Sequence, residues 1–116
     1  MKKITIVFSL LAALLTTNAM ADTISCQGHV TGLTFGDGGE VYITTTYRSD
    51  WMRICSVEYE WNAIGEVTCA MWSKNLTDAY LNDKQITVKY ADVTHTCANA
   101  PTWGSSSTPQ YIRLKE

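Results

Sequence analysis

Two cysteines and two histidines in this sequence have the chemistry of a metal site. Cys26 and His29 are three residues apart, and His95 and Cys97 are two residues apart. Two thiolates and two imidazoles form a ligand set that Zn²⁺ accepts. These spacings are not those of a standard zinc finger, and a disulfide formed in an oxidising compartment would consume the thiolates. We therefore predict no metal site and interpret His29 and His95 as surface residues near a disulfide.

Serine and glutamate residues could support hydrolysis, but their surroundings argue against a catalytic site. Ser56, Ser73 and the serines at 105–107 have no nucleophile motif around them. Glu58 and Glu60 alternate along one predicted strand, so their carboxylates share a face. Paired carboxylates can hydrolyse a glycosidic bond, whereas two carboxylates on a strand edge are usually only solvated. We predict no catalytic residue, no cofactor and no enzymatic activity.

Three of the four tryptophans lie at predicted strand ends or in loops rather than in a periodic apolar pattern. These are Trp51, Trp61 and Trp103. A tryptophan in a loop can stack on a sugar ring or anchor a protein partner. The alternative is that the three rings cap the open ends of a small barrel, because such large side chains are rarely left fully exposed. We predict that Trp51, Trp61 and Trp103 surround a binding surface.

The first 21 residues have the features of a signal peptide. Lys2 and Lys3 form a basic start, residues 4–15 form an apolar run, and residues 19–21 form an Ala-Met-Ala cleavage site. We predict cleavage after Ala21, a single domain over residues 22–116 and a periplasmic or secreted location. The alternative is an uncleaved membrane anchor, although the apolar run is short for a membrane span. We expect no membrane span after cleavage.

The chain that follows residue 21 is acidic and small. It carries seven basic and eleven acidic residues, which gives a net charge of −4. Binding of nucleic acid needs clustered Lys and Arg to neutralise phosphates, and the sequence contains no basic stripe. We therefore predict no nucleic-acid partner. Its 95 residues suffice for one domain, for which covalent cross-links matter.

All four cysteines follow the predicted cleavage site: Cys26, Cys55, Cys69 and Cys97. An even number of cysteines in a small exported domain predicts two disulfides. Four cysteines allow three pairings, and the sequence alone does not choose among them.

Alternating apolar and polar residues predict five strands, at residues 24–35, 40–47, 51–60, 85–93 and 109–115. Gly28 and Gly32 interrupt the first strand. Glycines inside a strand often mark a bend, which would let one strand serve two halves of a barrel. The alternation in the third strand changes phase near Ile54 and Cys55, which predicts a bulge. Residues 99–108 are predicted to form a loop.

One helix is expected between the third and fourth strands, over residues 69–81. Its apolar residues have helical spacing and predict one buried stripe, made of Cys69, Trp72, Leu76, Ala79 and Tyr80. Thr68 is the expected N-cap, and Asn82 is the expected left-handed residue at the C-terminal end. Three strands, one helix and two strands are the element order of the OB-fold. We therefore predict a mainly β fold, a five-stranded OB-fold-like barrel with one α-helix.

In this order of elements the chain resembles exported, disulfide-bonded OB-fold proteins typified by the B subunits of AB-type bacterial toxins. Residues 54–56, 68–70 and 84–88 are similar to the subtilase-cytotoxin and typhoid-toxin B subunits. Residues 75–81, followed by a strand that ends at Cys97, are similar to the cholera-toxin B subunit. The resemblance covers most of the chain after residue 21 as a pattern of elements, while the runs of similar residues are short.

The resemblance implies the disulfides Cys55–Cys69 and Cys26–Cys97 and a non-catalytic module that binds a glycan or a surface receptor as a ring oligomer. Trp103 follows Cys97 as a tryptophan follows the cysteine of the cholera-like subunit, at a longer spacing. The final strand, at 109–114, is a departure from the family. Two other functions stay open. One is a periplasmic inhibitor or immunity-type protein that binds another protein, and the other is a small structural envelope protein.

Overall fold

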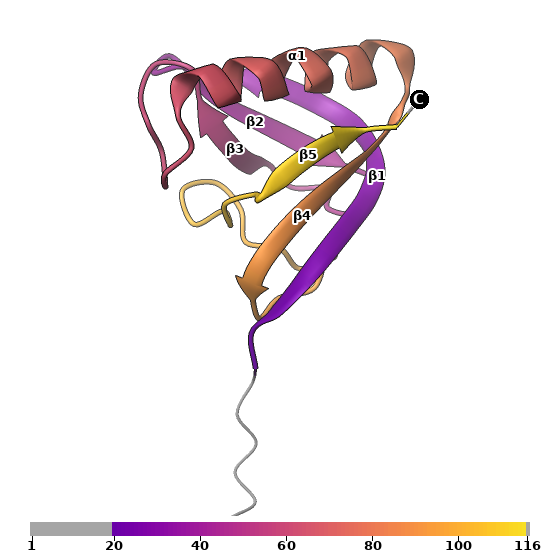
Figure 1. Ribbon diagram of the computed structural model, residues 1–116. Helices are drawn as coiled ribbons and strands as arrows, with labels where there is room; N and C mark the ends of the chain where they lie inside the picture. The colour runs from indigo at the N-terminus through magenta and orange to yellow at the C-terminus, as the bar shows by residue number, and fades with distance from the viewer. Residues whose placement is uncertain (1–19, 116) are drawn as a thin grey trace, which may run out of the picture.

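The computed structural model describes residues 20–115, so the predicted signal peptide lies outside the described residues except for Met20 and Ala21. The chain forms five strands and one helix, shown in Figure 1: β1 (Asp22–Phe35), β2 (Glu40–Thr45), β3 (Met52–Ser56), α1 (Glu66–Asn82), β4 (Gln85–Val93) and β5 (Tyr111–Leu114). This order confirms the predicted mainly β fold with one helix after the third strand. Within residues 20–115, no helix has the length and apolar character needed to cross a membrane.

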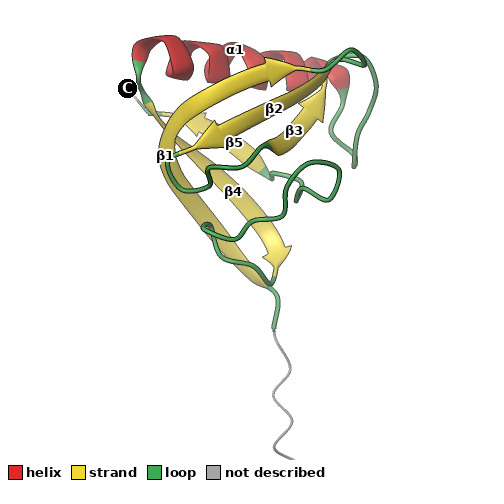
Figure 2. Ribbon diagram, turned by 180° about the vertical axis from the view of Figure 1, so that it is seen from behind, coloured by secondary structure: helices red, strands yellow, loops and turns green. Residues whose placement is uncertain are grey.

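The five strands form an antiparallel sheet with the order β3-β2-β1-β4-β5. The sheet curls into a half-barrel, which Figures 1 and 2 show from opposite sides. Residues 22–29 of β1 pair with β4, and residues 30–35 of the same strand pair with β2. The β1–β2 register shifts between Val30 and Gly32, where a bulge bends the strand. The predicted bend, which lets one strand serve both halves, is therefore confirmed.

β3 carries the predicted bulge. Val41 of β2 pairs with Cys55, whereas the next residue, Tyr42, pairs with Arg53. Ile54 is thus the extra residue, and it is fully buried. The bulge lets both Ile54 and Cys55 point into the core, although neighbours on a regular strand would face opposite sides.

Two strands end earlier than predicted. β2 ends at Thr45 rather than at residue 47, and β3 ends at Ser56 rather than at residue 60. The Ser56 hydroxyl donates a hydrogen bond to the Gly38 carbonyl and accepts one from the Glu58 N–H. Such local side-chain bonds offer the backbone an alternative to the sheet. Glu58 and Glu60 therefore lie in an irregular segment and do not alternate along a strand.

α1 begins at Glu66, three residues earlier than predicted, and Gly65 rather than Thr68 is the N-cap. The reason is that helical hydrogen bonding already starts at the Gly65 carbonyl. The Glu66 carboxylate lies in the first turn, where the helix dipole favours a negative charge. At the other end Asp83, not Asn82, adopts the left-handed conformation, with φ 52°.

The inner side of α1 covers one end of the half-barrel, as Figures 1 and 2 show. Cys69, Trp72, Leu76 and Ala79 are buried there, as predicted. Tyr80 was the fifth member of the predicted stripe, but it is 44% exposed. It follows Ala79 directly, and one residue along a helix turns the side chain by about 100°.

Both disulfides have the expected pairing. Cys26–Cys97 ties β1 to the segment after β4, and Cys55–Cys69 ties β3 to α1. The Cα atoms are 5.6 Å apart in each pair, and together the two bonds use all four cysteines. Three of the four cysteines are buried in the core, so the cross-links are part of the packing of the half-barrel.

Two tyrosines meet inside the half-barrel. The hydroxyl oxygens of Tyr47 and Tyr90 are 3.3 Å apart, and the Tyr90 hydroxyl also lies 3.9 Å from Met52 Sδ. Burial is the main cause that raises the pKa of both phenols above the ordinary value of a tyrosine. Both side chains are therefore neutral at physiological pH.

The two edge strands, β3 and β5, share no ladder in the described part of the chain. The segment that joins β4 to β5, residues 94–110, lies against β3 instead. The Trp103 N–H donates a hydrogen bond to the Trp51 carbonyl at 2.9 Å, and the Arg53 N–H donates one to Ser106 Oγ at 2.8 Å. This irregular β4–β5 segment therefore covers the edge of β3 and carries Trp103 to the outer face of the sheet.

Candidate functional site

The outer face of β2 and β3 carries aromatic and polar side chains. Val41 and Ile43 of β2 are fully buried, so Tyr42 and Thr44, which alternate with them, point outward. Tyr42 is the cross-strand partner of Arg53 on β3. The side chains of such a pair lie on the same face of a sheet. Tyr42 and Arg53 are therefore the centre of the outer face.

Trp103 packs on Tyr42 from the β4–β5 segment. Their ring centroids are 5.3 Å apart and the rings are tilted by 50°. The Trp103 backbone has φ 52°, a conformation that is uncommon for a residue other than glycine. Ser106 Oγ donates a hydrogen bond to the Trp103 carbonyl, and Arg48 Nε donates one to the Ala100 carbonyl. These bonds hold the segment against the sheet, and Trp103 remains 48% exposed.

The Arg53 guanidinium lies against two aromatic rings. Its central carbon is 4.7 Å from the centroid of the Trp61 ring and 5.5 Å from that of Tyr59. The group also donates a hydrogen bond to the Tyr59 hydroxyl. No carboxylate within the described residues forms a salt bridge with Arg53, and its Nε, which is buried, has no hydrogen-bond partner there. The cation is thus fixed by aromatic contacts and keeps hydrogen-bonding capacity.

A tight turn positions Trp61. Trp61 and Ile64 exchange two backbone hydrogen bonds, of 3.1 and 2.9 Å. The two residues between them, Asn62 and Ala63, have φ values of 49° and 68°. Two successive positive φ values are typical of a type I′ turn, which suits Asn better than Ala. The strained turn fixes the direction in which the Trp61 side chain leaves the backbone.

Trp51 lies over the bend of β1. A Cβ atom on Gly32 would be 3.0 Å from the Trp51 ring and 2.6 Å from Thr44 Oγ1, so only glycine leaves room here. Gly32 pairs with Thr44, which places the Trp51 ring one cross-strand row away from Tyr42. The Trp51 ring therefore extends the same outer face toward β1.

The structure thus brings Trp51, Trp61 and Trp103 to one face of the sheet rather than to the ends of the half-barrel. Sequence reasoning missed the residues that connect them, Tyr42, Arg53 and Tyr59. Tyr42 does alternate with buried residues along β2, which is a signal for an outward ring. Arg53 gave no such signal, because its partners come from a turn and a loop that follow β3.

No protein-family model matches this sequence, and no curated protein is significantly similar to it. The chemistry of the side chains indicates what this surface can bind. Exposed aromatic rings offer flat apolar surfaces for stacking, and a guanidinium offers directed hydrogen bonds and charge. A surface of this kind can bind a ring-shaped ligand with polar substituents or an anchor residue of a protein.

The four residues considered as metal ligands are used in other ways. Cys26 and Cys97 form a disulfide, which leaves no thiolate for a metal. His29 Nδ1 lies 3.0 Å from the exposed Asp83 carboxylate. Within residues 20–115, no group of three His, Cys, Asp or Glu residues has the geometry to hold a metal ion.

His95 and Ser107 form the arrangement closest to a nucleophile and its base. The Thr96 carbonyl can only accept, so His95 Nδ1 donates to it at 2.9 Å. Nε2 of the neutral ring then accepts from the Ser107 hydroxyl at 2.7 Å. A catalytic pair also needs a substrate site beside the hydroxyl, and the hollow next to His95 is not lined by Ser107. The bond instead ties the two ends of the β4–β5 segment together.

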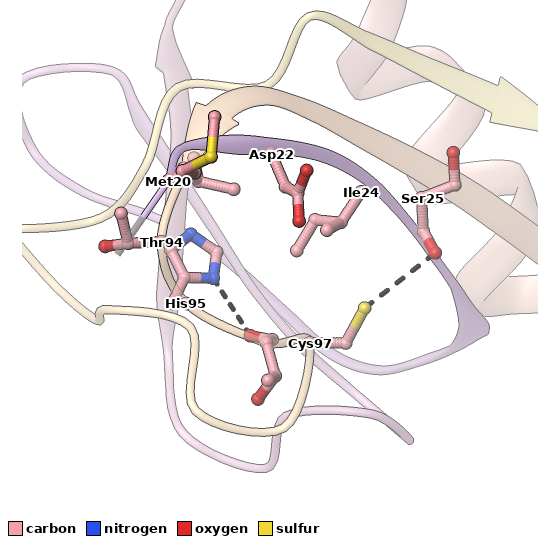
Figure 3. Close-up of a pocket in the computed structure, with 9 residues that line it drawn as sticks. Met20, Asp22, Ile24, Ser25, Thr94, His95 and Cys97 are labelled. Atoms are coloured by element: carbon pink, nitrogen blue, oxygen red, sulfur yellow. Dashed lines mark hydrogen bonds between the residues drawn. The ribbon is translucent and has the colours of Figure 1, made fainter. Parts of the chain in front are cut away.

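That hollow lies where β1 starts, and Figure 3 shows its lining. It has a volume of about 540 Å³ and lies between Met20, Asp22 and Ile24 on one side and Thr94 and His95 on the other. Met20 precedes the predicted cleavage position, so part of this wall would leave with the signal peptide. None of the three predicted tryptophans lines it. The outer face of β2 and β3 is therefore the stronger candidate.

Proposed function

We propose that this protein is a non-catalytic binding module that recognises a glycan or a surface receptor through the outer face of β2 and β3. The observation that carries the proposal is the convergence of Trp103, Tyr42, Arg53 and Trp61 on one face. Their rings come from a strand, a turn and a loop, and the Arg53 guanidinium lies among them. A sugar ring stacks on such side chains, and its hydroxyl groups accept hydrogen bonds from a guanidinium.

The position of the face supports the same interpretation. OB-folds that bind oligonucleotides or oligosaccharides use the face of the second and third strands and the loop between the fourth and fifth. Here Tyr42 and Arg53 lie on β2 and β3, and Trp103 comes from the β4–β5 segment. The net charge of −4 after residue 21 favours a glycan over a nucleic acid. Because fold alone does not fix function, this support is an analogy.

We infer that the protein works outside the cytoplasm, in the periplasm or after secretion. Its two disulfides fit an oxidising compartment, and the predicted signal peptide gives a route to it. We also propose that the protein is related in function to the B subunits of AB-type toxins. The support is the short segments of similar sequence at residues 54–56, 68–70, 75–81 and 84–88. The ring oligomer which that resemblance implies would appear as a pentameric mass in light scattering.

One observation also favours a second function, inhibition of a protein partner. Trp, Tyr and Arg are the residues enriched at the centres of protein interfaces. Arg53 between Tyr59 and Trp61 matches that composition. In this alternative the outer face would bind another protein in the periplasm, as an inhibitor or immunity-type protein does.

A glycan array and a pull-down from the periplasm, both with the oxidised protein, test the proposal. Trp103→Ala and Arg53→Ala should each weaken binding at least about tenfold, a typical cost for truncating an anchor residue. Tyr80→Ala is the matched control, because Tyr80 is an exposed aromatic residue on α1, away from this face.

Each outcome separates the proposals. Glycan binding that is lost in Trp103→Ala and kept in Tyr80→Ala supports the first function. Capture of one protein, lost in the same variants, supports the second. If Trp51→Ala, Trp61→Ala and Trp103→Ala all leave both kinds of binding unchanged, the outer face is not the binding surface.

A further inference from the structure

α1 carries exposed apolar residues toward both of its ends that no part of the described chain covers. Val67, Met71 and Leu81 are 76%, 65% and 72% exposed. Figures 1 and 2 show that α1 crosses one end of the half-barrel, so one side of the helix faces away from every strand. Three large apolar side chains on one short helix are more than the scattered single residues of an ordinary surface. This side of α1 requires an explanation beyond the proposed binding function.

These residues belong to a regular row. Val67, Met71, Lys74, Asp78 and Leu81 are separated by four, three, four and three residues. This is the spacing of the positions that face each other in a two-helix coiled coil. The row lies opposite the buried residues of the same helix, Cys69, Trp72, Leu76 and Ala79. We call these five residues the outer row.

The charges in the middle of the outer row are opposite and placed symmetrically. Lys74 and Asp78 lie on either side of position 76, and Met71 and Leu81 lie five residues on either side of the same position. In an antiparallel pair of identical helices centred there, Lys74 faces Asp78 of the other copy, and Met71 faces its Leu81. Each contact occurs twice, as a two-fold interface requires.

The state of both charges fits this pairing. Within the described residues Lys74 has no carboxylate in salt-bridge range, although its charge acts on Asp78 of its own helix. Asp78 accepts hydrogen bonds from Lys84, at 3.1 Å, and from Asn82. These bonds lower the pKa of the Asp78 carboxyl, with Lys84 as the largest cause. Asp78 is therefore ionised at neutral pH and can bind a second ammonium group.

We propose that the outer row of α1 is a self-association surface that binds α1 of a second copy of this chain in antiparallel orientation. The helix has 17 residues and is about 26 Å long, and with position 76 at the centre residues 70–82 of the two copies align, which leaves Val67 beyond the overlap. Four side chains of each copy, Met71, Lys74, Asp78 and Leu81, make a small interface. The dimer is therefore reversible, and it leaves the outer face of β2 and β3 free on both copies.

Sedimentation equilibrium of the oxidised protein over a range of concentrations tests the proposal. The mass should rise from that of a monomer toward that of a dimer, whereas the ring oligomer implied by the toxin resemblance would instead give the mass of a pentamer. Lys74→Asp places two carboxylates opposite two carboxylates, and Asp78→Lys does the same with ammonium groups. Each change alone should raise the dissociation constant at least about tenfold. Circular dichroism and thermal unfolding check that each variant is folded.

A mixture of the two variants is the decisive sample. In a mixed dimer every carboxylate of the K74D copy faces an ammonium group of the D78K copy, so a one-to-one mixture should dimerise again, to within about threefold of the unmodified protein. Met71→Lys should abolish the dimer, whereas Phe35→Lys, which changes an exposed apolar residue at the end of β1, should not affect it.

Three results would overturn the proposal. The protein could remain monomeric at all concentrations, it could form a larger oligomer that ignores both charge reversals, or the mixture of variants could stay monomeric. The last result would mean that α1 meets a different protein or a second copy in another register. None of these results bears on glycan binding, which the tryptophan variants test separately.

Discussion

β2 and β3 present two surfaces of different chemistry, although neighbouring residues build both. On the inner side Ile43 and Ile54 are fully buried among aliphatic residues of the core. On the outer side Tyr42 and Arg53 are only partly buried, and they contact rings from outside the two strands. One residue along β2 thus separates a packed interior from a half-open aromatic surface.

In this small domain the inner face of the two strands contributes to stability, and the outer face is available for binding. An inner residue is surrounded on all sides, so its loss leaves a cavity that the fold cannot easily fill. An outer residue has one or two ring contacts and water on its remaining side, so its loss affects stability little. Substitutions on the aromatic surface should therefore weaken ligand binding and change stability little. Substitutions on the inner face should lower the free energy of unfolding.

The largest effect is expected at the covalent links of the inner side. Replacing Cys26 and Cys97 together by Ala opens a loop of 71 residues and should lower the free energy of unfolding by about 4.4 kcal/mol. Removing Cys55 and Cys69 opens a loop of 14 residues and should cost about 3 kcal/mol. Urea unfolding followed by tryptophan fluorescence measures both. A larger loss for the shorter loop would contradict this entropic explanation.

The next effect compares two adjacent residues directly. Ile43→Ala should lower the free energy of unfolding by about 3.5 kcal/mol, since it leaves a cavity in the core. Tyr42→Ala, one position away on the outer face, should cost about 1 kcal/mol in the same urea titration. Equal losses at the two positions would mean that the outer ring cluster is a second core rather than a binding surface.

Alkaline pH should lower the free energy of unfolding through two buried tyrosines on the inner side of the sheet. The folded protein keeps the protons of Tyr47 and Tyr90 because burial raises the pKa of both, whereas the unfolded chain releases them near pH 10. Their contribution is thus complete below pH 10 and is lost as the pH rises above it. The free energy of unfolding should therefore be lower at pH 11 than at pH 8.

Urea titrations between pH 8 and pH 11 measure this loss, and Tyr47→Phe provides the control. That variant retains a buried ring but removes one ionisable group, so the loss at pH 11 should become smaller. An unchanged dependence on pH in Tyr47→Phe would assign the effect to other groups.

The smallest effect on stability is expected at Arg53. Arg53→Lys should change the free energy of unfolding by less than about 0.5 kcal/mol, because the residue lies on the outer face. An ammonium group cannot stack as a planar guanidinium does on Trp61 and Tyr59. Ligand affinity, measured by titration calorimetry once the array identifies a glycan, should therefore fall about tenfold. Unchanged affinity would remove Arg53 from the site.

Most of the fold could be predicted because its signals are local. The alternation along β1, β2 and β4 and the helical spacing of Cys69, Trp72 and Leu76 identified the elements in their correct order. The errors lie at element ends, where local hydrogen bonds compete with regular structure. The Ser56 hydroxyl ends β3 early, and Gly65 starts α1 early.

The candidate site was predicted only in part. Its three tryptophans could be recognised by their positions at strand ends and in loops. Their companions, Tyr42, Arg53 and Tyr59, could not, because the contacts join residues that depend on register and on the path of a loop. The bulge at Ile54 sets which residue of β3 stands beside Tyr42.

The sequence by itself determined the order of elements, the presence of an even set of cysteines and the bend in β1. These features follow from the conformational preferences and polarity of residues close together in the chain. Only the tertiary structure decided that the β4–β5 segment lies along β3, which brings Trp103 onto Tyr42 and completes the outer face. Contacts between residues 103 and 42 depend on how the whole chain packs, and no local preference encodes them.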